Sequence, residues 1–137
     1  MKISSSLSLA AGIGLMLAVP VFAHHSFAAQ YDRDKPITLV GPVTKIDWIN
    51  PHARFFVDVK DANGKVVNWE VELAAPAMLM RRGWTRNSIK LGESVTVSAF
   101  LAKDGSNLAN ASTVTLVDGR KVFAGSSGDA GNAGTAP

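Results

Sequence analysis

The sequence predicts a small all-β domain with one short helix, and three observations support this class. Two stretches alternate strictly between apolar and polar residues, which is the period of a strand with one buried face. Much of the remaining chain is rich in β-branched residues and is divided by Asn-Gly, Asp-Gly and Asn-Pro pairs, which are typical of turns. Only Pro76 to Arg82 has helix signals, with proline at its start and Gly83 after its end.

The chain begins with a predicted signal peptide, residues 1–23. A basic start is followed by an apolar run from Leu7 to Val19, and small residues precede a cut after Ala23. The run is short and interrupted by glycine, which argues against a membrane span. We therefore expect a periplasmic mature chain that begins at His24 and has no membrane segment after cleavage. An uncleaved N-terminal anchor is the alternative.

The mature chain divides into three parts. Residues 24–36 form a mixed polar arm that ends at Pro36, and residues 37–123 form the β-domain. Residues 124–137 contain Gly, Ser, Ala and Asp without a periodic apolar pattern, so we expect a disordered tail. Within the domain, the first strand runs from Ile37 to Trp48, and Gly41-Pro42 inside it indicates a bulge or an edge.

The second and third strands, Ala53 to Lys60 and Val66 to Leu73, form a predicted hairpin. A two-residue turn would place Val57 opposite an acidic residue on the buried face. A three-residue connection with Gly64 in the left-handed region instead pairs Val57 with Trp69, and it sets Arg54 opposite Glu72. We predict the second register because a slip of one residue would turn the apolar face outward.

After the helix, two or three further strands complete the domain. The predicted strands are Ser94 to Leu101, Ala109 to Leu116 and Lys121 to Phe123. Five or six antiparallel strands with a helix between the third and fourth indicate a small Greek-key barrel of the oligonucleotide/oligosaccharide-binding (OB) type. A β-sandwich is the alternative fold.

Composition excludes several classes of protein. The 137 residues include no cysteine, which rules out disulfides, zinc-thiolate sites and thiol enzymes. The formal net charge is +3, but the basic residues are scattered among acidic ones, so no nucleic-acid partner is expected.

The histidines indicate a metal site. Cleavage after Ala23 would place His24 and His25 at a free amino terminus, and His52 follows the predicted turn Asn50-Pro51. The amine and imidazole of His24, with the imidazole of His52, would form a tetragonal nitrogen set that suits Cu(II). His25 is an alternative ligand, because an N-terminal His-His can bind Cu(II) through the amine, an amide nitrogen and the second imidazole. Alternatively, all three histidines are ordinary polar residues.

Aromatic residues offer a second functional hypothesis. Trp48 and Trp84 lie at the ends of predicted elements and Phe56 lies on a polar strand face, where these rings could bind a ligand. The protein would then be a binding module without a cofactor, for an envelope protein partner or an oligosaccharide. An enzyme is less expected, because Glu70 and Glu72 lack a partner cleft and no broad aromatic plane for a copper monooxygenase is recognisable.

Several segments resemble a family of exported bacterial proteins that is described only as a domain of unknown function. The resemblance covers His24 to about Gly125. It implies export and a single small β-domain, and it implies no activity. The segments that carry it are His24 to Phe27, Tyr31 to Pro36, Asp47 to His52, Asp61 to Glu72, Arg81 to Thr85 and Lys103 to Asn107.

Overall fold

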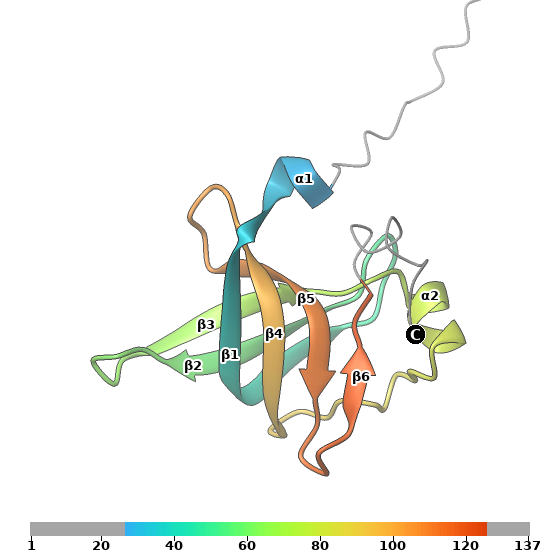
Figure 1. The fold of residues 1–137 in the computed structure, drawn as a ribbon. Coiled ribbons are helices and arrows are strands. Elements are labelled where there is room, and N and C mark those ends of the chain that lie inside the picture. The colour runs from blue at the N-terminus through green and yellow to red at the C-terminus, as the bar shows by residue number, and fades with distance from the viewer. Residues whose placement is uncertain (1–26, 126–137) are drawn as a thin grey trace, which may run out of the picture.

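The computed structural model describes residues 27–125 (Figure 1). The predicted signal peptide, His24, His25 and residues 126–137 of the predicted tail lie outside this range. Among the described residues, no helix has the length and apolar character needed to cross a membrane.

The described chain contains two short helices and six strands. The helices are α1 (Phe27–Gln30) and α2 (Pro76–Arg81). The strands are β1 (Tyr31–Asp47), β2 (Arg54–Lys60), β3 (Val66–Glu72), β4 (Ser94–Ala102), β5 (Leu108–Thr115) and β6 (Lys121–Phe123). The prediction of an all-β domain with a helix between the third and fourth strands is confirmed.

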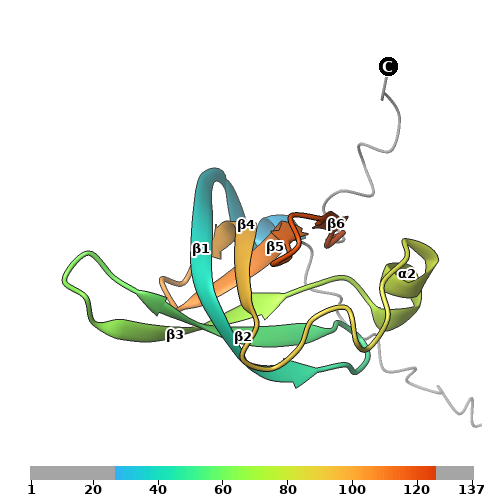
Figure 2. The same ribbon diagram turned by 90° about the horizontal axis from the view of Figure 1, so that it is seen from below.

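Five of the strands close into a ring. The sheet order is β3-β2-β1-β4-β5-β6, and an additional pairing of β3 with β5 joins its two sides. This last pairing is parallel, whereas all the others are antiparallel. Strand β1 is long and strongly curved (Figures 1 and 2), so its first part pairs with β4 and its last part with β2. The ring surrounds one core, which fits both the small closed barrel and the sandwich arrangement considered as its alternative.

The β2–β3 hairpin has the predicted register. Val57 pairs with Trp69 and Arg54 pairs with Glu72. Gly64 has φ +81°, a left-handed conformation that glycine adopts without steric cost. The backbone N–H of Asp61 donates to the carbonyl of Lys65 at 2.8 Å, which closes the three-residue connection.

Two predicted boundaries were wrong. The chain before Pro36 is not an arm, because Phe27 begins α1 and β1 already begins at Tyr31. Ala124, the first residue of the predicted tail, is buried, and its N–H donates to the carbonyl of Ser112 at 2.9 Å. The folded domain therefore extends beyond both of the boundaries predicted from the apolar pattern, Ile37 and Phe123.

The apolar side chains form two separate clusters. The main core fills the ring, and its largest fully buried side chains include Phe55, Leu39 and Leu79. A second, smaller cluster joins α1 to the sheet through Phe27, Tyr31 and Ala102, with Phe100 and Leu108 packed against it. The ring of Phe27 lies 5.5 Å from that of Tyr31 and 5.8 Å from that of Phe100. The second cluster fixes the start of the described chain against β4 and β5.

Strand β1 passes very close to β2 at Gly41. A Cβ atom at this position would lie 1.9 Å from the carbonyl oxygen of Asp58. The bulge or edge predicted at Gly41-Pro42 does not lie at Gly41, where the structure has a close backbone approach. The irregular register with β2 lies slightly later, between Val43 and Lys45.

Candidate functional site

Polar side chains gather where the start of β1, the start of β2, the end of β3 and the middle of β5 approach one another. Strand register explains the gathering, because Glu72 pairs with Arg54 on one side and with Asn110 on the other. Their neighbours Phe55, Val71 and Ala109 belong to the main core, so alternation directs these polar side chains away from it. We call the group the Glu72 cluster; it comprises Tyr31, His52, Arg54, Glu70, Glu72 and Asn110.

The carboxylate of Glu72 is the centre of this cluster. Its side chain is 7% exposed, and its Oε1 lies 2.8 Å from Nδ1 of His52. The side-chain amide of Asn110 donates to the same oxygen at 3.3 Å. An ionised carboxylate only accepts hydrogen bonds, so Nδ1 of His52 must carry a proton. In the neutral ring, Nε2 is then left with its lone pair free to bind a ligand.

Arg54 is shared between the two carboxylates of β3. Its Nη1 donates to Oε1 of Glu70 at 2.7 Å, whereas Nη2 lies 3.6 Å from Oε2 of Glu72. The predicted cross-strand pairing of Arg54 with Glu72 is correct in register, but the closer ion pair is the diagonal one to Glu70. Glu72 therefore retains its closest contact with His52.

Tyr31 links the Glu72 cluster to the second apolar cluster, of which it is also a member. Burial raises the pKa of its phenol far above the usual range, and the negative charge of Glu72 raises this pKa further. The side chain is therefore a neutral phenol at physiological pH. Oδ1 of Asn110 has no hydrogen-bond partner in the described chain.

Of the three predicted metal ligands, the structure places one. His52 lies in the Glu72 cluster, on the connection between β1 and β2, and its side chain is 26% exposed. His24 and His25 lie outside the described residues. Within residues 27–125, no group of three or more His, Asp or Glu side chains is arranged to hold a metal ion. The described chain thus contains one of the three predicted ligands, His52, together with a carboxylate that orients its ring.

The three predicted ligand-binding aromatics do not form one surface. Trp84 is 2% exposed and packs in the main core, where its indole Nε1 donates to the carbonyl of Phe123 at 3.0 Å. The ring of Trp84 therefore does not lie on an exposed face of the domain. Trp48 is half-buried against the same core, and Phe56 is half-buried under Nζ of Lys45, 4.9 Å from the ring centroid.

Sequence reasoning did not connect Tyr31 or Asn110 with this cluster, and it missed the role of Glu72 as the partner of His52. One signal for Glu72 was available. His52 precedes Arg54 by two residues, and residues two apart in an extended chain lie on the same side, so both can face Glu72. Asn110 and Tyr31 gave no comparable signal, because they reach the cluster only through the closure of the ring.

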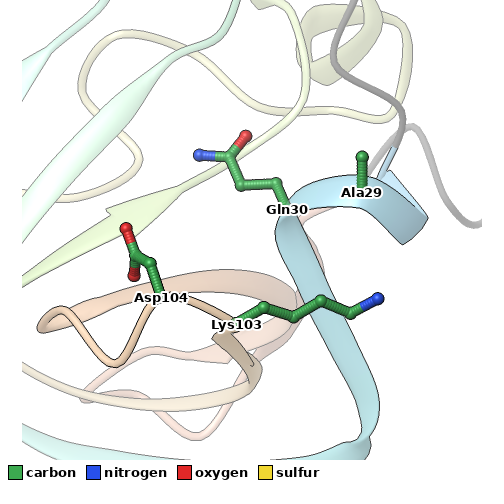
Figure 3. A pocket seen from close by; sticks show the side chains of 4 residues that line it. All are labelled: Ala29, Gln30, Lys103 and Asp104. Carbon is green, nitrogen blue, oxygen red and sulfur yellow. The ribbon is translucent and has the colours of Figure 1, made fainter.

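A pocket of about 510 Å³ lies beside α1, and it is separate from the residues named above. The described side chains that line it are Ala29, Gln30, Lys103 and Asp104. Gln30 and Asp104 extend toward the same opening, whereas Lys103 extends along α1, where its Nζ donates to the carbonyl of Ala28 at 2.6 Å (Figure 3). The contact between Lys103 and Ala28 fastens α1 to the turn between β4 and β5.

Fold and site together define a small, mostly antiparallel β-domain in which a ring of strands carries a part-buried carboxylate–histidine pair outside its apolar core. The chain belongs to a family of unknown function (DUF6152), whose profile matches residues 14–111. This range includes His24 and His25 as well as every member of the Glu72 cluster. A search of curated proteins found no match.

Proposed function

We propose that the protein is exported to the periplasm, loses residues 1–23, and binds Cu(II) as an accessory protein that carries, buffers or delivers the metal. In this proposal the ligands are the amine and imidazole of His24 and Nε2 of His52. His25 is an alternative ligand. Three nitrogens of this kind in a tetragonal arrangement suit Cu(II), which also has the highest affinity among the divalent first-row metals.

The observation that carries the proposal is the 2.8 Å hydrogen bond between Nδ1 of His52 and Glu72. Histidines that bind metals usually donate their other ring N–H to a carboxylate, carbonyl or water, which fixes the tautomer and makes the ligating nitrogen more basic. Glu72 is itself held by Asn110, so the ring of His52 has a defined orientation. The side chain of His52 is 26% exposed, so part of its ring is open to solvent.

The position of Phe27 supports the participation of His24. Three residues of extended chain span about 10 Å, which limits the distance of the mature terminus from Phe27. The ring of Phe27 packs on Tyr31, and Tyr31 lies within the field of Glu72, the partner of His52. A short chain of contacts therefore connects the beginning of the described fold with the candidate ligand.

Blocking the terminal amine tests this proposal. We expect Nα-acetylation of the chain that begins at His24 to weaken Cu(II) binding at least about 100-fold, because loss of a direct ligand should exceed the 10–100-fold effect typical of outer-shell changes. A competition titration with a chelator of known affinity measures the change. Equal affinity before and after acetylation would exclude the amine as a ligand. No uptake by either form would instead favour a binding module without a metal.

A further inference from the structure

Positive charge is concentrated on one side of the domain, where α2 and the residues after it meet β6. Residues 76–86 and 117–123 contain five basic residues and one acidic residue, Asp118. The other residues of the described range, 27–125, contain eight basic and nine acidic residues. The net positive charge of the described domain therefore comes from these two segments.

Contacts bring the two segments together. The indole of Trp84 donates to the carbonyl of Phe123 at 3.0 Å, and the guanidinium of Arg82 lies 4.2 Å from the centroid of the Phe123 ring. Lys121 precedes Phe123 by two residues on β6, so both side chains lie on the same side of this strand. Figures 1 and 2 both show α2 beside β6, at the opposite end of the molecule from the tip of the β2–β3 hairpin. We call this region the α2–β6 surface; its members are Met80, Arg81, Arg82, Arg86, Lys121 and Phe123.

Carboxylates of the described chain do not neutralise this surface. Within residues 27–125, neither its three arginines nor Lys121 forms an ion pair. All four side chains belong to exposed residues. Arg120, the remaining basic residue of the two segments, is paired with Asp118. The α2–β6 surface thus presents four positive charges to an external partner.

The type of basic residue favours phosphate groups as the ligand. Four of the six arginines of the chain lie in the two segments, whereas lysine is the commoner basic residue elsewhere. The planar guanidinium group has a fork of N–H donors that matches the oxygens of a phosphate, which makes arginine the preferred residue for phosphate recognition.

Exposed apolar side chains lie among these charges. Met80 is 55% exposed and Phe123 is 36% exposed. Basic side chains mixed with exposed apolar ones are typical of surfaces that bind where lipid headgroups meet acyl chains. The backbone of a nucleic acid has no apolar layer directly behind its phosphates, so the combination favours a lipid bilayer.

We propose that the α2–β6 surface binds the phosphate headgroups of an anionic phospholipid bilayer. Each basic side chain near such a bilayer strengthens binding about fivefold, so four of them favour an anionic over an uncharged bilayer several hundredfold. The rest of the described domain has no net positive charge, and the bound protein is therefore oriented with this surface toward the lipid. The inference goes beyond the proposed function and does not depend on copper.

Co-sedimentation with vesicles tests this inference. The protein is the metal-free chain from His24 to Pro137, which contains the whole described fold. The vesicles consist of phosphatidylcholine alone or of phosphatidylcholine with about one third phosphatidylglycerol, a lipid with a net negative charge. We expect binding to the anionic vesicles at low salt, and its loss at about 1 M salt, where the Debye length is about 3 Å.

Two matched double variants locate the binding surface. Arg81→Gln/Arg82→Gln should weaken binding to the anionic vesicles about 30-fold, from about fivefold for each charge. Lys60→Gln/Lys65→Gln removes the same charge from exposed residues at the tip of the β2–β3 hairpin, and it should change the binding less than about threefold. Arg82 also packs on Phe123, so Arg81→Gln/Arg86→Gln replaces the first variant if that variant does not fold. The same loss of about 30-fold is then expected.

Three results would overturn the inference. The first is failure of the protein to bind anionic vesicles at low salt. The second is an equal loss of binding in the arginine and the lysine variants, which would show that only the overall charge matters. The third is binding to duplex DNA without binding to vesicles, which would assign the surface to a different polyanion.

Discussion

Replacing His52 with alanine lowers the Cu(II) affinity of the mature protein at least about 100-fold, if the ion is held by the fold as well as by the terminus. The substitution removes the ring whose Nδ1 is bonded to Glu72, and with it the only described histidine that can bind a metal. The comparison should be made with His25 replaced by alanine in both proteins. In that background the alternative peptide-like mode, which needs the imidazole of His25, is no longer available.

The His25→Ala protein and the doubly substituted protein are compared by competition titration at one pH and one ionic strength. Thermal unfolding of the metal-free proteins serves as the control for folding, because His52 is partly exposed and does not belong to either apolar cluster. Unchanged affinity after loss of His52 would show that copper binds to the terminal segment alone. The proposed site would then not exist.

Gly41→Ala is expected to destabilise the domain by about 3 kcal/mol, the upper end of the usual cost of overpacking. The added Cβ would lie 1.9 Å from the carbonyl oxygen of Asp58, so the backbone of β1 or β2 must move. Neither strand can move easily, because β1 also pairs with β4 and β2 with β3. Urea unfolding of the two proteins measures the difference.

Gly64→Ala is the matched control for this prediction. Gly64 lies in the turn between β2 and β3, and a Cβ atom there meets nothing within 4 Å, although its φ is +81°. The cost should therefore be about 1–2 kcal/mol, from backbone conformation alone. If Gly41→Ala costs no more than Gly64→Ala, the close approach of β1 to Asp58 is not a constraint on the fold.

The parts of the fold that follow from local pattern were predictable. The alternation in β2 and β3, together with Gly64, defined the hairpin register, which the structure confirms. The helix α2 begins at Pro76 as predicted, and Gly83 follows it with φ +90°. In each case the residues that determine the structure lie close together in the sequence.

The parts that depend on contacts between distant segments were not predictable. Residues 31–36 are mostly charged, and only pairing with β4 makes them part of β1. Trp84 is near the end of a helix, yet it is buried in the main core, where the carbonyl of Phe123 accepts a hydrogen bond from its indole N–H. The candidate site was also only partly predictable. His52 could be singled out because histidine is rare in this chain, whereas Asn110 meets Glu72 only after β3 pairs with β5.

In the proposed site, one Cu(II) ion is bound by both the mature terminus and His52. Hyperfine spectroscopy of the copper-loaded His25→Ala protein, with ¹⁵N-labelled histidine, counts the imidazole rings bound to the metal. We expect two rings, of which one is lost in the His52→Ala variant. A single ring in the starting protein, with a spectrum that the substitution of His52 leaves unchanged, would contradict the proposed site.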